Sequence, residues 1–349
     1  MLDFFQGNTD KIFVIAEAGS NWKCGTYEED LKQALKLIQI ASDCGANAVK
    51  FQTFRSETTY VHNAGKSDYL DKKGISVEIN ELFENNAMPY EMIPELYNYA
   101  KKKNILFMST PFSVRDAKEI NPYVSIHKVA SYEINHVRLL EYLLQTNKPV
   151  IVSTGASTYD DIDFAVNILK NSKSSVSLLQ CTSCYPCPIE ALNLSTIPKI
   201  KSRYNLPVGL SDHSIDPIVA PLTAIGLGAT IIEKHFTIDK TLSGLDHMFA
   251  LSPDELKLMI STIRKAELAK GHGEKIILPE ELELKQFATR SLQALTNIQK
   301  GDLLVEGINF DVLRPGNRVR GLDARFLQNV NGKKSKENVL KGDGIIHFE

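Results

Sequence analysis

The sequence predicts an α/β fold in which a (β/α)8 barrel precedes a small C-terminal module. Up to about residue 270, short β-branched runs alternate with longer segments whose apolar residues recur at helical spacing. Eight strand–helix units fit into this stretch, which is the usual size of such a barrel. The first strand–helix junction, EAGSNWKCG, lacks the G-x-G-x-x-G spacing of a dinucleotide-binding fold, which disfavours an open doubly wound sheet.

The elements of the barrel follow one another in chain order. Strands are predicted over residues 11–17, 47–53, 105–110, 125–131, 149–154, 176–181, 207–212 and 229–236. Helical spacing is clearest over residues 28–46, where Gly45 marks the end, and over residues 89–103, 159–170 and 253–270. The predicted domains are a barrel over 1–272, a polar linker over 273–286, and a module of short strands and Gly-rich turns over 287–349.

Composition narrows the range of partners and compartments. The 349 residues include 40 Lys and Arg against 42 Asp and Glu, so the net charge of -2 gives no general attraction to nucleic acid or anionic membranes. The N-terminus lacks a signal-peptide pattern, and the longest mostly apolar run, Ile218 to Ile232, is interrupted by proline and glycine. This run predicts a buried helix that leads into a buried strand. We expect a cytoplasmic protein with no nucleic-acid or membrane partner, and five cysteines predict no disulfide scaffold.

Polar side chains mark the C-terminal end of nearly every predicted strand. In a (β/α)8 barrel these ends build the active site, so the side chains should converge. The residues are Glu17, Lys50, Gln52, Ser109, Thr110, Lys128, Ser131, Glu133, Ser153, Thr154, Thr182, Ser183, Tyr185, Ser211, Asp212, His213, Glu233, Lys234 and His235, with Asp246 in the following loop.

These side chains suggest two subsites. Lys50 and Lys128, together with the strand-end hydroxyls, suit a phosphate dianion. His213 and His235 end adjacent strands and suit a shared divalent metal, with Glu17 and Asp246 completing or supporting its shell. Spacing alone leaves alternatives open, because such histidines also occur as core residues, the hydroxyls also cap helices, and a buried lysine is also the nucleophile of Schiff-base aldolases.

Cys181, Cys184 and Cys187 form a C-x2-C-x2-C pattern that is compatible with an iron–sulfur or zinc site. A cluster usually needs a fourth thiolate, and the remaining cysteines lie far away in the first strand–helix unit. Cys181 also ends a buried strand, where a thiol serves as a small apolar filler. We therefore expect no cluster.

Short motifs occur in a fixed order along nearly the whole chain. They are IAEAGSN, GANAVKFQTF, STPFS, HKVASYE, STGAS, QCTSCYP, GLSDHS, EKHFT and VLRPGN. This order resembles the sialic acid (N-acetylneuraminate) synthase family, including its relatives that make legionaminic and pseudaminic acids. The resemblance implies a barrel followed by an antifreeze-like (SAF) domain, which covers the partner's active site in a domain-swapped homodimer.

The resemblance also implies roles for individual residues. His213 and His235 match the metal ligands, usually of Mn²⁺ or Mg²⁺, and Glu17 and Asp246 match catalytic carboxylates that move protons or orient water. Positions that hold phosphoenolpyruvate correspond to Lys50, Thr110, Lys128, Ser131, Ser153 and Ser211. Positions around the sugar correspond to Gln52, Glu133, Ser183 and Tyr185. Arg314 matches a tail arginine that reaches the sugar's acetamido group in the other subunit.

The implied reaction is a transferase reaction in which phosphoenolpyruvate condenses with an open-chain N-acyl hexosamine, such as N-acetylmannosamine, and phosphate is released. Alternatives for the acceptor are a 2,4-diacetamido-2,4,6-trideoxyhexose and a 6-phosphorylated sugar. Two departures from the family pattern bear on the acceptor: Trp22 stands where relatives carry a histidine at the barrel mouth, and Ser183 stands where some have asparagine. A Schiff-base aldolase using Lys50, Lys128 or Lys234 and a non-catalytic carbohydrate-binding protein are the alternatives from other classes.

Overall fold

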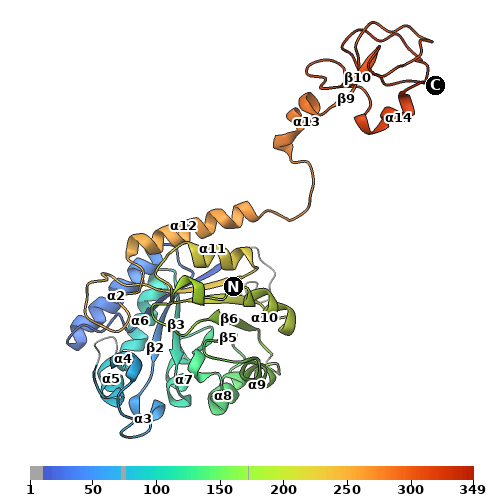
Figure 1. The fold of residues 1–349 in the computed structure, drawn as a ribbon. Coiled ribbons are helices and arrows are strands. Elements are labelled where there is room, and N and C mark those ends of the chain that lie inside the picture. Colours follow the sequence, from blue (N-terminus) through green and yellow to red (C-terminus); the bar gives the residue numbers. More distant parts are fainter. Residues whose placement is uncertain (1–10, 72–75, 172) are drawn as a thin grey trace. The chain divides into compact units, whose positions relative to one another are not determined.

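The computed structural model describes residues 11–71, 76–171 and 173–349. The chain divides between Gly271 and His272 into two compact units, which are described separately (Figure 1).

The first unit is built on eight parallel strands. These are β1 (Phe13–Gly19), β2 (Ala48–Thr53), β3 (Leu106–Pro111), β4 (His127–Val129), β5 (Val150–Ser153), β6 (Val176–Cys181), β7 (Val208–Asp212) and β8 (Ile231–His235). Their order is β3-β2-β1-β8-β7-β6-β5-β4, and β3 and β4 at the two ends of this order also pack together. The first and last strands are neighbours, with Phe13 opposite Ile231 and Glu17 opposite His235. The predicted (β/α)8 barrel is confirmed.

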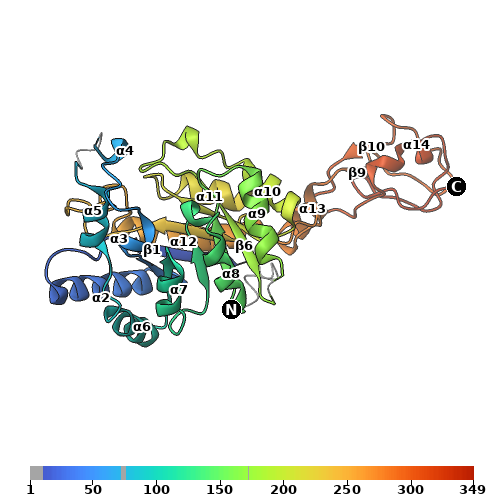
Figure 2. The same cartoon turned by 90° about the horizontal axis from the view of Figure 1, so that it is seen from below.

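Helices surround this sheet (Figures 1 and 2). They are α2 (Tyr27–Asp43), α3 (Ser56–Thr59), α4 (Asp68–Asp71), α5 (Ile79–Asn86), α6 (Met92–Lys102), α7 (Val114–Ile120), α8 (Val137–Gln145), α9 (Tyr159–Leu169), α10 (Thr196–Tyr204), α11 (Val219–Gly226) and α12 (Pro253–Lys270). Reciprocal capping boxes start α2, α9 and α12 at Thr26, Thr158 and Ser252. Among the described residues, no helix is long and apolar enough to cross a membrane.

Two predicted elements differ from the structure. The strand predicted over residues 125–131 shortens to β4, because the chain turns into a 3-10 helix at Ser131–Glu133. The predicted linker over 273–286 contains a 3-10 turn at Pro279–Glu281 and most of α13 (Leu282–Ala288). Neither of these two segments buries a residue, so the hydrophobic periodicity that would have revealed a helix is missing.

Strand residues alternate between the inside and the outside of the barrel. Phe13 and Ile15 of β1 belong to a small interior cluster with Ala48, Met108, Ile126, Ile151, Leu179 and Ile231. Val14 and Ala16 belong instead to the large cluster between the strands and the helices. Because side chains alternate with period two, the next inward residue after Ile15 is Glu17. The interior cluster therefore forms an apolar floor, and polar residues follow it toward the C-terminal ends of the strands.

The second unit is small. It contains the antiparallel pair β9 (Ser291–Ala294) and β10 (Phe310–Leu313), a 3-10 turn at Ala324–Phe326 and α14 (Leu327–Val330). Its core consists of eight buried residues, among them Leu292, Leu304 and Phe310. The assignment of this unit as an antifreeze-like domain stays a prediction from the resemblance.

Candidate active site

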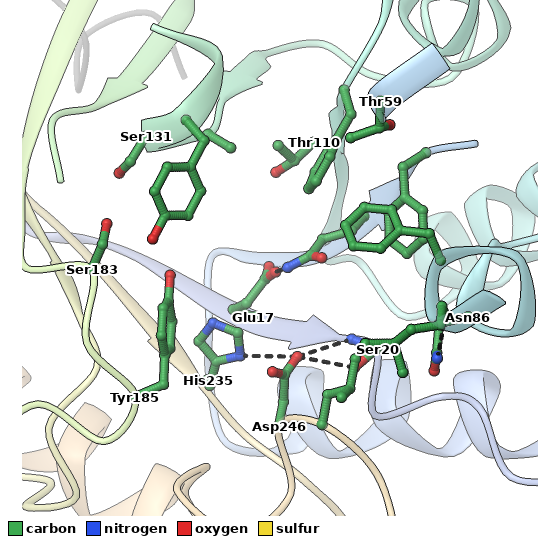
Figure 3. Close-up of a pocket in the computed structure, with 18 of the residues that line it drawn as sticks. Glu17, Ser20, Thr59, Asn86, Thr110, Ser131, Ser183, Tyr185, His235 and Asp246 are labelled. Atoms are coloured by element: carbon green, nitrogen blue, oxygen red, sulfur yellow. Dashed lines mark hydrogen bonds and ion pairs between the residues drawn. The ribbon is translucent and has the colours of Figure 1, made fainter. Parts of the chain in front are cut away.

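A cavity of about 810 Å³ opens at the C-terminal ends of the barrel strands (Figure 3). Every barrel residue to which the family resemblance assigns a role lines it: Glu17, Lys50, Gln52, Thr110, Lys128, Ser131, Glu133, Ser153, Ser183, Tyr185, Ser211, His213, His235 and Asp246. The structure thus brings these side chains together, while their roles stay predictions. Arg314 belongs to the second unit, which is described by itself.

Four buried charges at the base of the cavity form what we call the charge quartet: Glu17, Lys50, Glu233 and Lys128. The Lys50 Nζ lies 2.6 Å from Glu17 Oε2 and 3.7 Å from Glu233 Oε2. The Lys128 Nζ lies 3.5 Å from Glu233 Oε1, which also accepts a hydrogen bond of 3.0 Å from Ser211. Glu233 was among the strand-end side chains expected to converge, but no role was predicted for it. Its position two residues before His235, on the same side of β8, is the signal that it faces the cavity.

The two carboxyl groups of the quartet have opposite pKa shifts. Burial raises the pKa of Glu17 to about 7, against the opposing effect of Lys50. Burial also disfavours ionised Glu233, but Lys128 and Lys50 together outweigh it and lower the pKa of Glu233. Glu233 faces two cations whereas Glu17 shares one, so near neutral pH Glu17 is the carboxyl group that exchanges a proton.

Hydroxyl groups surround the two ammonium groups. The Lys50 Nζ donates to Thr110 Oγ1 at 3.0 Å, and the Lys128 Nζ donates to Ser153 Oγ at 2.7 Å. The Gly155 amide donates to Ser131 Oγ at 2.9 Å. A Cβ at Gly155 would lie 2.3 Å from Ser183 Oγ, so only glycine lets this backbone approach. Two cations with converging hydroxyls form a site suited to a phosphate group.

The two predicted metal-binding histidines lie side by side above the quartet. The ring centroids of His213 and His235 are 5.6 Å apart. The Nδ1 atom of His213 is 2.9 Å from the Thr182 carbonyl, which leaves Nε2 available as a ligand. Burial lowers the pKa of His235 well below its usual value, and its buried Nδ1 has no hydrogen-bond partner. A neutral, unpartnered imidazole nitrogen beside a second imidazole fits a divalent cation.

Asp246 lies beside His235 in the cavity. Its Oδ2 lies 3.7 Å from His235 Nδ1 and accepts hydrogen bonds from the amide and hydroxyl of Ser20, as Figure 3 shows. Gly19 has φ +53°, and a Cβ there would lie 2.5 Å from Asp246 Oδ2, so glycine permits this approach. Among the described residues, no three His, Cys, Asp or Glu side chains form a chelating group. An ion held by the two imidazoles would have positions open for oxygen atoms of substrate or water.

Strand alternation corrects several sequence predictions. Ser109 and Thr154 were grouped with the phosphate-binding hydroxyls, but neither lines the cavity. Ser109 is buried and its hydroxyl bonds Thr53, while Thr154 donates to the Leu179 carbonyl. Each lies next to an inward residue, Thr110 or Ser153, and therefore faces the other way.

Lys234 was a candidate for a Schiff-base nucleophile, and it does not line the cavity either. It is buried on the outer side of β8, where its Nζ contacts the carboxylate of Asp212. The same Nζ donates to the Ser214 carbonyl at 2.6 Å, to the Ser214 hydroxyl at 3.1 Å and to the Asp216 carbonyl at 3.0 Å. Lys234 therefore fastens the segment around His213 to the strand that carries His235.

Trp22 and Cys181 also differ from expectation. Trp22 is buried in the large cluster between the strands and the helices, and it lines a separate, smaller pocket with Lys23 rather than the cavity at the strand ends. Cys181 is not only a core filler, since it lines the cavity and lies 3.9 Å from His213 Nδ1. The thiols of Cys184 and Cys187 contact carbonyl groups of neighbouring prolines instead.

A parallel eight-stranded barrel with a charged cavity at its strand ends has the architecture of a barrel enzyme. The NeuB family model matches residues 37–275. A pseudaminic acid synthase of Campylobacter jejuni is 36% identical over 97% of this chain and 96% of its own, and an N,N'-diacetyllegionaminic acid synthase of the same species is 37% identical over 95% and 98%. A solved N-acetylneuraminic acid synthetase of Leptospira borgpetersenii superposes with a TM-score of 0.69 at 36% identity, covering 78% of this chain and 90% of that one. The chain belongs to the NeuB family.

Replacing Lys234 by Met is expected to destabilise the barrel by about 3–5 kcal/mol, because it leaves the buried Asp212 carboxylate unpaired. Urea unfolding followed by fluorescence measures this selectively, since the single tryptophan, Trp22, is buried in the barrel. The control is Lys240→Met, which removes a half-exposed ion pair with Glu255 and should cost less than about 1 kcal/mol. Equal losses for both variants would contradict the structural role of Lys234.

Replacing Glu17 by Gln should alter how stability depends on pH. The raised pKa means that folded Glu17 retains its proton from pH 4.5 up to about 7 while the unfolded chain loses it, so wild-type stability falls as pH rises through this window. The stability of Glu17→Gln relative to wild type should therefore grow by about 3 kcal/mol between these pH values. Urea midpoints at each pH measure the difference. Above pH 8 the stability difference between Glu17→Gln and wild type should stay constant. A difference that does not change with pH anywhere would refute the raised pKa of Glu17.

Proposed function

We propose that this protein condenses phosphoenolpyruvate with the aldehyde of an open-chain N-acyl hexosamine and releases phosphate. The observation that carries the proposal is the neighbouring position of two subsites in one cavity, the lysine and hydroxyl cluster and the histidine pair. The first suits a phosphorylated donor, and the second suits a metal-dependent carbonyl acceptor. Family membership and the named synthases among its relatives support the same reaction.

Phosphoenolpyruvate binds at the base of the cavity in this proposal. Lys50 and Lys128 neutralise its phosphate and carboxylate, and Thr110, Ser131 and Ser153 donate from their hydroxyl groups. Both lysines already have polar partners and act through charge, so no covalent bond to nitrogen is required. The cleft holds the methylene carbon facing the sugar aldehyde, which lowers the entropic cost of bringing two reactants together.

The bond changes balance without an oxidant. The methylene carbon of phosphoenolpyruvate forms a bond to the aldehyde carbon, and the aldehyde oxygen takes up a proton. Water adds to the former enol carbon, the bond from that carbon to the phosphate oxygen breaks, and a keto acid and phosphate leave. Glu17 is the proton donor or acceptor of this scheme, because its pKa is raised to about 7 and Gln52 fixes its Oε1 at 3.0 Å.

His213 and His235 would hold a divalent cation, Mn²⁺ or Mg²⁺, with Asp246 beside them. Such an ion supplies Lewis-acid polarisation of the aldehyde oxygen. Tyr185 packs against the His213 ring in a tilted arrangement, with ring centroids 4.1 Å apart, and limits the direction from which a substrate approaches. Glu133, whose pKa burial raises to about 7, contributes a hydrogen-bonding group to the sugar.

We further propose a domain-swapped homodimer in which Arg314 binds the sugar's acyl group in the partner's cavity. Arg314 is exposed and directly follows β10. Pro315 restricts the backbone after it, and Gly316 adopts the positive φ of 57° that the turn requires. The Gly316 amide donates to the Phe287 carbonyl at 3.1 Å, which braces the turn. The segment before β9 carries exposed apolar residues that a second subunit would cover, among them Ile276, Leu282 and Phe287.

Removing divalent metal should abolish phosphate release, and adding Mn²⁺ or Mg²⁺ should restore it. His213→Ala and His235→Ala should each lower turnover at least about 100-fold, because each removes one of few protein ligands. Mn²⁺ binding measured by electron paramagnetic resonance gives a readout that does not depend on activity, and His272→Ala in the second unit is the control. Full turnover after exhaustive chelation would refute the metal, and reduction of a pyruvate adduct on lysine by borohydride would favour an aldolase.

Arg314→Ala should raise the KM of the sugar about 10-fold or more and leave that of phosphoenolpyruvate much less changed, because a hydrogen bond from a charged group is lost. Arg325→Ala in the same unit, where the arginine pairs with Asp323, is the control. Mixed dimers of Arg314→Ala and His213→Ala subunits should regain activity, since one cavity then has an intact barrel and an intact partner tail. Exchanged heterodimers without any activity would exclude action across the interface.

A further inference from the structure

The segment between β8 and α12 carries Asp246, and backbone hydrogen bonds close it at its base. The Leu251 amide donates to the His235 carbonyl at 2.9 Å, and the Thr237 amide donates to the Leu251 carbonyl at 2.9 Å. Residues 238–250 therefore form a loop with fixed ends, which we call the Asp246 loop. Fixed ends alone do not determine the direction of a side chain inside such a loop, since loops are the more mobile parts of a fold.

One imidazole of the Asp246 loop turns away from the cavity. Of residues 244–249, all of which the structure describes, His247 alone does not line the cavity. It is buried, with 1% of its surface exposed, and its ring lies so close to Gly244 that a Cβ there would be 2.6 Å from His247 Cδ2. The ring therefore has little room to move. Asp246 faces the cavity while its neighbour His247 points into the protein.

The buried imidazole is attached at one nitrogen atom. His247 Nδ1 lies 2.6 Å from Oγ1 of Thr237, a residue with no exposed surface. The other ring nitrogen, Nε2, has no hydrogen-bond partner among the described residues. Burying a polar ring with an unpartnered nitrogen is unfavourable, and an apolar side chain would fill the same space at lower cost. The hydrogen bond at Nδ1 is therefore what a histidine adds at this position.

This hydrogen bond lies next to the contact between Asp246 and His235. Thr237 follows His235 by two residues and His247 directly follows Asp246, so two adjacent side-chain contacts join the end of β8 to the loop. Asp246 Oδ2 lies 3.7 Å from His235 Nδ1, and Figure 3 shows its two hydrogen bonds from Ser20. Both partners of the carboxylate belong to other segments, so it meets them only where the loop backbone at residue 246 is held in place.

We propose that His247 is a positioning residue, which holds the Asp246 carboxylate against His235 and Ser20 through its own hydrogen bond to Thr237. His247 touches no substrate in this arrangement, because it does not line the cavity. The placement of Asp246 follows from these contacts alone, whereas the effect of that placement on cation binding and turnover rests on the proposed function. Groups that orient the surroundings of a metal typically change its affinity about 10- to 100-fold.

The first test measures the position of Asp246 without substrate or metal. His247→Leu and Thr237→Val each remove the hydrogen bond while filling a similar volume, whereas His247→Asn and Thr237→Ser retain a group that can form it. Hydrogen exchange at the Ser20 amide, which donates to Asp246, is followed by mass spectrometry of overlapping peptides. It should become about 10-fold faster or more in the first pair and stay within about threefold of wild type in the second.

Two controls separate positioning from a general loosening of the barrel. The Thr154 amide, which donates to the Leu179 carbonyl elsewhere in the barrel, should exchange at the wild-type rate in every folded variant. Thr241→Val removes an exposed hydrogen bond to Asp239 in the same loop and should leave exchange at Ser20 unaffected. Unchanged Ser20 exchange in both bond-deleting variants, or an equal acceleration at Thr154, would overturn the inference.

The second test measures cation binding and turnover. His247→Leu should raise the Kd of Mn²⁺, measured by electron paramagnetic resonance, and lower kcat, each about 10-fold, and leave the KM of phosphoenolpyruvate within about twofold. In an Asp246→Ala background the same substitution should change the Kd less than about twofold, since the group that it positions is already gone. Equal effects in both backgrounds would contradict action through Asp246. A wild-type protein that neither binds Mn²⁺ nor releases phosphate, with Ser20 exchange still dependent on His247, would count against the proposed function and leave the positioning role standing.

Discussion

Lys50 and Lys128 place two positive charges inside the barrel, where an unpaired ammonium group would be strongly destabilising. Glu17 and Glu233 compensate them, and the four charges sum to nearly zero when both carboxyl groups are ionised. A phosphorylated ligand that binds beside the charge quartet would add negative charge to these balanced groups. Because Glu17 is the easier of the two to protonate, ligand binding and proton uptake become linked at one residue. In the proposed function, anion recognition and acid–base chemistry would thus depend on the same buried contacts.

The apolar floor below and the Lys234 contacts outside keep this arrangement rigid. Ile15, Met108 and Ile231 fill the barrel interior. The charged side chains therefore have no room to move toward the N-terminal ends of the strands, and water does not reach them from that side. Lys234 joins β8 to the segment that carries His213. The separation between the two imidazoles is consequently set by the protein, which reduces the ordering that a bound cation would require.

Much of the fold and of the candidate site could be predicted, because the C-terminal ends of all strands in a parallel barrel lie at one face. The eight strand patterns predicted the barrel, and the polar residues at their C-terminal ends predicted most of the cavity lining. The direction in which each side chain points was the weak point. Ser109 and Thr154 were assigned to the phosphate subsite although they point outward, while Glu233 received no role although it lies in the same inward row as His235. Counting every second residue along each strand from its apolar interior residue gives the correct direction for all three side chains. The apolar side of the cavity was beyond such counting, because Tyr60 directly follows α3 and Phe83 belongs to α5, and the approach of these segments depends on tertiary packing.

The pairing of β1 with β8 also constrains how the protein is made. Phe13 leaves the ribosome before its partner Ile231, with six strands synthesised in between, so β1 keeps an open edge until β8 is made. The last barrel strand must join both β7 and β1 before the cavity exists. The second unit lies after α12 in the chain, so its residues leave the ribosome when every strand of the barrel is already available. A nascent chain stalled before β8 would expose an unpaired edge and an apolar interior, which makes that stage the natural point for chaperone binding.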